Sequence, residues 1–199
     1  MTELLRPTPA IGSVATTIIK TPRLTLRAPR AEDASAIAAI ANDRRIAENT
    51  ARIPHPYRLT DAQEFIAYVT GSAQETIFVI TLPSERIIGT CGAGSIDGGR
   101  PEIGYWLGVL YWGNGYASEA ARAVINHAFT TLGYDTLEAA ARVSNPASRR
   151  VLEKCDFQWT GVALRRSHVI GSHVPVDRFR LDRALWAKAR YQNETEQVA

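Results

Sequence analysis

The chain has 199 residues, of which 45% are apolar and 22% are charged, and its formal net charge is +3. This length suits one domain with a full hydrophobic core, and so small a charge gives no basic stripe for nucleic acid. The longest apolar runs fall short of the ~20 residues of a membrane helix. Arg6, Pro7 and Pro9 interrupt any run that resembles a signal peptide. We therefore expect a cytoplasmic protein that acts on neither membranes nor nucleic acid.

The cysteines and histidines indicate neither a disulfide framework nor a metal site. Cys91 and Cys155 are too few to staple a secreted fold and lack metal-ligand spacing. The histidines form no His-Glu-x-x-His pattern or similar cluster: His55, His127, His168 and His173. We expect two reduced structural thiols and no bound metal.

The first half of the chain alternates between short strands and helices. Residues 1–20 are predicted to form a flexible arm, and the alternation over 23–27 predicts a half-buried strand. Thr60 with Gln63 resembles a capping box that opens a helix ending at Gly71. The remaining predictions are helices over 31–42 and 44–49, a proline loop over 53–57, and a meander of strands over 76–81, 86–91 and 102–107.

The second half begins with a glycine segment, Trp112-Gly113-Asn114-Gly115-Tyr116-Ala117-Ser118. Behind it, apolar residues recur at helical spacing up to Leu132, which predicts an amphipathic helix packed on a sheet. The later elements are predicted as a strand over 136–141, a helix from Pro146 to Lys154, and strands over 159–164 and 176–181. Together these elements predict a single α/β domain around a mixed sheet.

The glycine segment predicts an anion cradle. Glycines let backbone N–H groups approach a bound group, and a helix N-terminus adds roughly half a positive charge of dipole. A Walker-type loop needs Gly-Lys-Ser/Thr, whereas this chain has Gly115-Tyr116-Ala117. A dinucleotide loop needs a third Gly or Ala where Ser118 stands. The predicted anion is a phosphate of another ligand, and the alternative is a plain glycine turn before a core helix.

The order of elements resembles the Gcn5-related N-acetyltransferase (GNAT) fold. The family's acyl-CoA loop has Gln or Arg, two residues, Gly, one residue, then Gly or Ala. Here Ala117 meets the last position and Trp112 replaces the usual first residue. Four further segments resemble the RimJ/RimL branch, which acetylates the N-termini of ribosomal proteins: residues 21–27, 53–57, 102–106 and 145–154. One departure is Cys155-Asp156-Phe157, where that branch usually has Leu-Gly-Phe.

The resemblance implies one GNAT domain over residues 21–186, between the arm and a C-terminal tail over 187–199. It implies a mixed, mostly antiparallel seven-stranded sheet flanked by helices, of the α+β kind. It also implies acetyl-CoA as cosubstrate without a metal. The residues that it assigns to the acetyl-CoA site are Leu107, Trp112, Gly113, Asn114, Gly115, Tyr116, Ala117, Ser118 and Asn145.

Glu102 is the candidate catalytic base. Alternation places it on the same strand face as Gly104 and Trp106, with Ile103 and Tyr105 opposite. Taken alone, Glu102 is a solvated strand charge. In related acetyltransferases a carboxylate on this strand often acts as base, so the resemblance implies that Glu102 accepts the amine proton, directly or through water.

The resemblance gives roles to three more residues. A splayed neighbouring strand exposes a backbone N–H near Leu107, which holds the thioester carbonyl. Taken alone, Leu107 is a core leucine. Asn145 is an N-cap before Pro146 and also bonds the pantetheine arm. Ser148 is either a helix-surface serine or the group that protonates the leaving thiolate. Tyr105 competes for that role by its chemistry.

The acceptor walls have two candidates. Arg165, Arg166, His168 and His173 lie between the last two predicted strands and either border the acceptor mouth or form a solvated loop. The loop over 53–57 is the other candidate, because its prolines make it rigid.

These residues predict an acetyl-CoA-dependent N-acetyltransferase in which the amine attacks the thioester directly. The predicted acceptor is the N-terminal α-amine of a protein or peptide. The alternatives are a small amine such as an antibiotic, a polyamine or an amino acid, and an acyl-CoA-binding regulator without turnover. A monomer and a homodimer are both consistent with the sequence.

Overall fold

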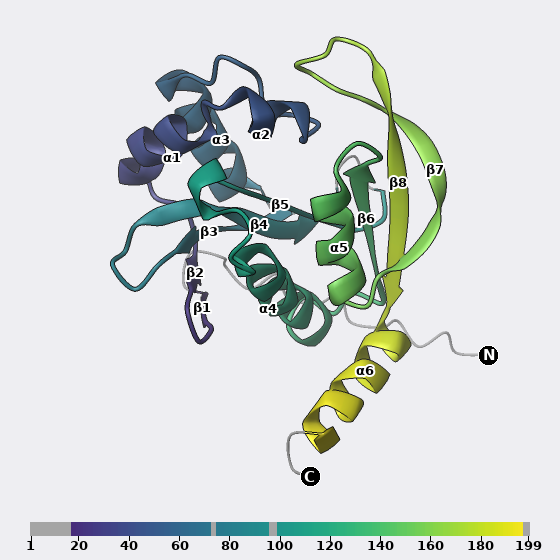
Figure 1. Cartoon of the computed structure of the whole chain (residues 1–199). Helices are drawn as coiled ribbons and strands as arrows, with labels where there is room; N and C mark the ends of the chain where they lie inside the picture. The colour runs from purple at the N-terminus through teal and green to yellow at the C-terminus, as the bar shows by residue number, and fades with distance from the viewer. Residues whose placement is uncertain (1–16, 73–74, 96–98, 197–199) are drawn as a thin grey trace, which may run out of the picture.

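The computed structural model describes residues 17–72, 75–95 and 99–196, which build one sheet with helices on both faces (Figure 1). The sheet has eight strands in the order β1-β2-β3-β4-β5-β6-β8-β7. Every neighbouring pair is antiparallel except β5 and β6. The strands are β1 Ile18–Lys20, β2 Thr25–Arg27, β3 Glu75–Thr81, β4 Ile87–Gly94, β5 Glu102–Leu107, β6 Thr136–Arg142, β7 Gln158–Arg166 and β8 His173–Asp182. The α+β class and the mixed, mostly antiparallel sheet are confirmed.

The predicted number of seven strands was wrong, because the N-terminal arm contributes an eighth. Residues 18–20 of that arm form β1, which pairs with β2 through Ile19 and Leu26. The rest of the arm, residues 1–16, lies outside the described residues. At the other end, most of the segment predicted as a tail belongs to helix α6 (Arg183–Glu196), which extends away from the sheet (Figure 1).

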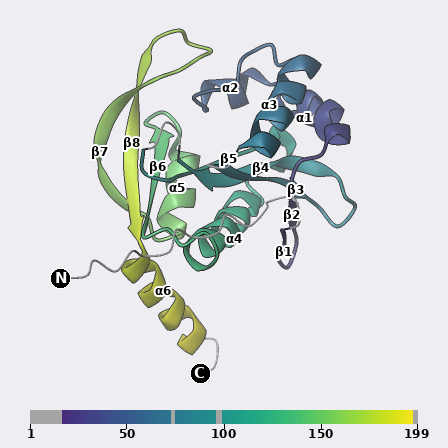
Figure 2. The same cartoon turned by 180° about the vertical axis from the view of Figure 1, so that it is seen from behind.

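The other helices form two layers (Figures 1 and 2). On one face α4 packs over a core that includes Phe78, Leu137 and Phe179, and α5 adds Leu152 to it. On the opposite face α1 and α3 cover a smaller core around Val79. The helical elements are η2 Ala31–Asp33, α1 Ala34–Ala41, α2 Arg44–Glu48, α3 Leu59–Gly71, η3 Val109–Tyr111, α4 Tyr116–Thr130 and α5 Pro146–Lys154, followed by α6.

Helix α3 begins differently from the prediction. We expected Thr60 and Gln63 to form the capping box, whereas the helix begins at Leu59 with Arg58 as its N-cap. The Arg58 N–H donates to the Asp61 carboxylate over 2.6 Å. A carboxylate in the first turn is a stronger acceptor than a glutamine amide, and it also interacts favourably with the helix dipole. Asp61 therefore replaces Gln63 as the capping partner.

The parallel strands β5 and β6 position the site. Their only ladder pair among the described residues is Glu102 with Glu138, at the start of β5. Beyond that pair the strands diverge toward their C-terminal ends, where β5 leads into the glycine segment before α4 and β6 leads into α5. The sheet therefore opens where both helices begin. Ligands of sheets with parallel strands commonly bind at such a crevice.

Candidate active site

The glycine segment lies at the start of α4, where the sequence predicts an anion cradle. Gly113 and Gly115 have φ angles of +77° and +78°, in the left-handed region that favours glycine, and Gly115 is the N-cap of the helix. The first N–H groups of a helix have no intrahelical partner, so those after Gly115 are available to an anion. Gly113, Asn114 and Gly115 are exposed. The segment therefore has the backbone geometry of an anion site.

Two side chains of the segment stabilise its backbone. The Trp112 indole N–H donates to the Leu107 carbonyl over 2.8 Å, and the Asn114 amide donates to the Trp112 carbonyl over 3.0 Å. These bonds connect the loop to the end of β5. The structure thus brings Leu107 close to residues 112–118. The side chains of Trp112 and Asn114 are themselves engaged in stabilising the loop.

Sequence reasoning missed Arg23 and Glu119. These two residues pair with each other, and Arg23 also bonds the backbone of the glycine segment. Glu119, in the first turn of α4, accepts from the Thr21 hydroxyl at 2.6 Å and the Arg23 Nε at 2.7 Å. Arg23 also donates to the Asn114 carbonyl at 3.0 Å and lies over the Tyr116 ring. Burial alone would raise the pKa of Glu119, but these hydrogen bonds outweigh it and lower the pKa. Arg23 therefore neutralises an ionised carboxylate that would otherwise repel an anion.

The backbone N–H of Leu107 is directed away from β4. Leu107 pairs with Gly89, and the next residue, Gly108, donates its N–H to the Ile88 carbonyl over 2.8 Å. Successive N–H groups of a strand point to opposite sides, so the N–H groups of Leu107 and Tyr105 point toward β6. That is where the two strands diverge. The Leu107 side chain is buried in the core, as expected.

Tyr105 and Ser148, the two candidate acids, are in direct contact. The Tyr105 hydroxyl lies 3.0 Å from the Ser148 hydroxyl and donates to the Ser148 carbonyl at 3.1 Å. Asn145 caps α5 as predicted, with its side-chain oxygen accepting from the Ser148 N–H at 3.1 Å. Burial raises the pKa of Tyr105, so its hydroxyl keeps its proton.

Glu102 lies on the opposite face of β5, as the alternation predicts. Tyr105 packs against the core under α4, whereas Trp106 packs against the core under α1 and α3. Both oxygens of Glu102 are paired with Arg165, at 2.5 Å and 2.8 Å. Arg165 and Arg166 lie within β7 and His173 begins β8, so of the four residues expected between the last strands only His168 is in the turn.

The structure separates two residues that were expected to act on one thioester. Glu102 and Leu107 are the first and last residues of β5, so their Cα atoms lie about 16 Å apart in an extended strand. A carboxylate at Glu102 cannot touch an amine that attacks a carbonyl held by the Leu107 N–H. Any proton transfer to Glu102 therefore passes through water.

Loops from both sides approach each other above the face that carries Glu102. The His168 N–H, in the turn between β7 and β8, donates to the Ala51 carbonyl over 3.1 Å. The Arg142 side chain, at the end of β6, donates to the carbonyl of Glu48 in α2. The loop over 53–57 lies beside them, with Tyr57 buried against α1 and α3. The loop over 53–57, Arg165 and the turn at His168 therefore border this face, whereas Arg166 and its partner His173 lie on the opposite side of β7 and β8.

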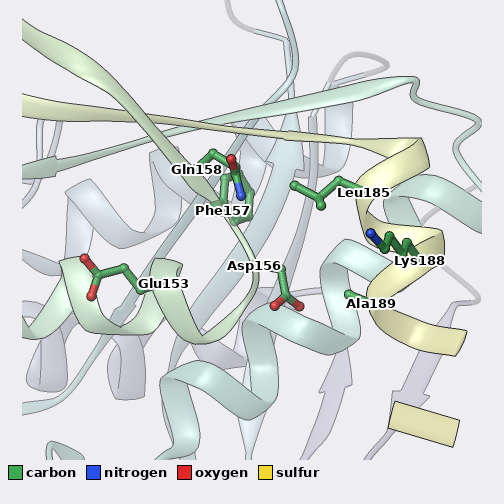
Figure 3. A pocket seen from close by; sticks show the side chains of 7 residues that line it. All are labelled: Glu153, Asp156, Phe157, Gln158, Leu185, Lys188 and Ala189. Atoms are coloured by element: carbon green, nitrogen blue, oxygen red, sulfur yellow. The ribbon is translucent and has the colours of Figure 1, made fainter. Parts of the chain in front are cut away.

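Among the hollows on the described surface, two differ in their relation to the candidate site. One, of about 340 Å³, lies between the end of α5, the start of β7 and α6, and contains none of the predicted site residues (Figure 3). The other, of about 680 Å³, extends along α4 beside residues 19–23 and includes Gly115 and Ser118 of the cradle. Only the second adjoins the candidate site.

The described residues hold no group of three or more His, Cys, Asp or Glu side chains that could bind a metal ion. In that same part of the chain, none of the helices has the length and apolar character to cross a membrane. Independence from metal is still a prediction.

Known proteins share this sequence and fold. The profile of the family described as the acetyltransferase (GNAT) domain matches residues 23–158. An uncharacterized N-acetyltransferase of Bacillus licheniformis is 32% identical, with 81% of this chain and 93% of that protein covered. RimL, a ribosomal-protein α-N-acetyltransferase solved with coenzyme A, has a TM-score of 0.73 at 18% identity, covering 83% and 98% of the two chains. Spermidine N-acetyltransferase of Vibrio cholerae, solved with coenzyme A and spermine, has a TM-score of 0.72 at 21% identity, covering 84% and 99%.

The two solved structures share the fold, while the family profile and the curated relative share the sequence over most of the chain. The glycine segment before α4 is consistent with that assignment, because left-handed glycines followed by a helix start have the backbone geometry of an anion site. The chain therefore belongs to the GNAT family and is an acetyl-CoA-dependent N-acetyltransferase.

Proposed function

We propose that this N-acetyltransferase acetylates the N-terminal α-amine of a protein or peptide, as a member of the RimJ/RimL branch. The observation that carries the proposal is the opening between β5 and β6. The cradle and Ser148 lie on the side of α4 and α5, whereas Glu102 lies on the other face. A donor held on one face and an acceptor held on the other would meet in this opening.

The donor side is built for acetyl-CoA. The N–H groups after Gly115 bind the pyrophosphate, and the residues of this cradle are 113–118. Asn145, which caps α5, bonds the pantetheine arm, and the N–H of Leu107 polarises the thioester carbonyl. Support for these roles comes from the positive φ angles of the two glycines and from the direction of the Leu107 N–H.

In the reaction, the amine nitrogen bonds to the carbonyl carbon and the carbon–sulfur bond breaks. Glu102 takes the proton that the amine loses, through water. Ser148 gives its proton to the departing sulfur, the Tyr105 hydroxyl returns a proton to the serine oxygen, and water restores the proton of the tyrosine. This contact supports Ser148, because an isolated serine hydroxyl is a weak acid.

The pKa of the acceptor favours an α-amine over a lysine. At about pH 7.5 an α-amine of pKa ~7.8 is roughly one-third unprotonated, whereas a lysine of pKa ~10.4 is about a thousandth unprotonated. A single carboxylate that acts through water is a weak general base. It therefore suits the α-amine, a larger fraction of which is already deprotonated. A small-molecule amine is the second candidate, because the shared fold also serves spermidine acetylation in the Vibrio cholerae enzyme.

The experiment is coenzyme A release measured across peptides with varied N-termini and a set of small amines. We expect turnover with peptides that have a free N-terminus and none with the same peptides blocked by acetylation. Turnover with small amines alone would contradict the peptide acceptor. Calorimetric binding of acetyl-CoA without turnover on any acceptor would instead favour a non-catalytic regulator.

A further inference from the structure

Charged side chains from four neighbouring strands lie on the face that carries Glu102. Besides Glu102 on β5 and Arg165 on β7, Glu138 on β6 pairs with Arg178 on β8 at 3.1 Å and with Arg100 at 3.0 Å. We call these five residues the charged floor. The Glu102–Arg165 pair spans from β5 to β7 across β6 and β8, strands that in a flat sheet would be about 14 Å apart. The sheet therefore curves toward this face, as β7 and β8 do in Figure 1.

The charged floor carries three guanidinium groups against two carboxylates. Each carboxylate oxygen already accepts a bond from an arginine. Burial alone would raise the pKa of Glu138, but the bonds from Arg100 and Arg178 outweigh it and lower the pKa. Both glutamates are therefore neutralised, and one positive charge is left over.

The cations of the charged floor are also the more accessible groups. The side chains of Arg100, Arg165 and Arg178 are 63%, 40% and 48% exposed, whereas those of Glu102 and Glu138 are 27% and 21% exposed. A guanidinium has five N–H donors, and each of these arginines uses only one or two of them on the glutamates. An incoming group therefore meets unused donors.

We propose that the acceptor peptide carries acidic side chains near its N-terminus and that the charged floor binds them. This inference rests on the proposed transfer to a peptide N-terminus. The reacting amine lies at the opening, beside the N–H groups of Tyr105 and Leu107, which are three to five residues from Glu102 along β5. That separation is roughly 10–16 Å, or three to five residues of extended peptide. The preferred acidic positions are thus about the third to the fifth.

The same arrangement disfavours polyamines. A polyamine has a second ammonium group besides the amine that reacts. That group would bind more tightly if a carboxylate were free to pair with it, but both glutamates of the charged floor are already paired with arginines. The ammonium would also lie beside exposed guanidinium groups and be repelled by them. A polyamine thus binds this face less well than an acidic peptide of similar length.

The test compares peptides that differ only in charge. One peptide has serine at the first position and aspartate at the third and fourth, and the matched peptide has asparagine at both. Two more peptides move the aspartate pair to the second position and to the seventh. Each aspartate–arginine pair is half-exposed and worth up to about fivefold, so we expect about a tenfold preference in kcat/KM for the first peptide. Spermidine should react more slowly than any of these peptides.

Variants of the charged floor identify the source of the preference. Arg178→Gln should reduce the ratio of kcat/KM between the aspartate and asparagine peptides by about threefold, because it removes one exposed guanidinium that does not touch Glu102. Arg166→Gln is the matched control. It removes the same charge from the next residue of β7 beyond Arg165, on the opposite face, and should leave the ratio unchanged.

The ratio distinguishes this inference from the proposed function. Equal kcat/KM for the aspartate and asparagine peptides would overturn the acidic acceptor while leaving transfer to a peptide α-amine intact. A preference that persists in Arg178→Gln, or that falls equally in Arg166→Gln, would overturn the role of the charged floor. Absence of acetylation on all four peptides, together with turnover of spermidine, would overturn both proposals.

Discussion

The face of the sheet under α4 and α5 and the face that carries Glu102 are built in different ways. The first uses backbone geometry: left-handed glycines, two helix starts and one strand N–H. The second uses ion pairs between residues far apart in sequence, such as Glu102 with Arg165. A cofactor that is the same in every turnover suits fixed backbone groups. An acceptor that differs between related enzymes is better bound by side chains, because a single substitution can change which acceptor they recognise.

The largest effect should come from a substitution on the face that carries Glu102. We expect Glu102→Gln to lower turnover about a hundredfold or more at pH 6, where the acceptor amine is protonated and needs a base. The loss should shrink by about pH 9, because an α-amine of pKa ~7.8 then arrives deprotonated. The measurement is initial rates over that pH range, with folding checked because the substitution removes one charge from the Arg165 pair. A loss below about threefold at every pH would remove Glu102 from the reaction.

The contact between Ser148 and Tyr105 tests the donor face next. Ser148→Ala should lower kcat about ten- to a hundredfold, the value of a hydrogen bond to a developing charge, with little change in acetyl-CoA affinity. If the two hydroxyls act as a unit, Tyr105→Phe should add little to Ser148→Ala. Tyr134→Phe removes a half-buried tyrosine hydroxyl away from the site and serves as control. Independent, additive losses would show that the hydroxyls do not act together.

The cradle should respond to backbone geometry as well as to bulk. Gly115→Val places a branched side chain at a φ of +78° and should weaken acetyl-CoA binding by at least about tenfold, or 1.4 kcal/mol. Gly115→Asn is the matched variant, because asparagine tolerates the left-handed region and should lose less. Calorimetry on the folded proteins measures both. Unchanged affinity in Gly115→Val would place the pyrophosphate elsewhere.

The smallest effect should come from the cap of α5. Asn145→Ala should cost about 1 kcal/mol of unfolding free energy through the lost bond to the Ser148 N–H. Asn145→Asp keeps an acceptor for that bond but lacks the amide N–H donors. Denaturant unfolding and calorimetry together separate the cap from the contact to acetyl-CoA. If Asn145→Asp retains full affinity, the asparagine serves only as a cap.

The contrast between local backbone geometry and ion pairs distant in sequence also explains what could be predicted from the sequence. Helix α5 has the predicted bounds, because Asn145 and Pro146 specify its start locally. The start of α4 was predictable for the same reason, since Gly113 and Gly115 stand directly before the helix. The short strand β1 and helix α6 were missed, because tertiary pairing and packing decide three-residue strands and terminal helices.

The ion pairs were beyond local reasoning. Glu119 could not be connected to Arg23, nor Glu102 to Arg165, because the residues of each pair lie 96 and 63 positions apart.

The turn at Cys155-Asp156-Phe157 departs from the usual Leu-Gly-Phe pattern without a change of backbone conformation that would exclude aspartate. Asp156 has a φ of +66° in the place of the usual glycine, and aspartate is among the few residues that enter the left-handed region. The turn is kept although the glycine is lost.

The proposed reaction transfers an acetyl group to a peptide α-amine. Mass spectrometry of a peptide that carries both a free N-terminus and an internal lysine, incubated with the enzyme and acetyl-CoA, tests it most directly. We expect one acetyl group on the N-terminal nitrogen and an unmodified lysine. Acetylation mainly on the lysine, or on neither amine while a small amine is acetylated, would contradict it.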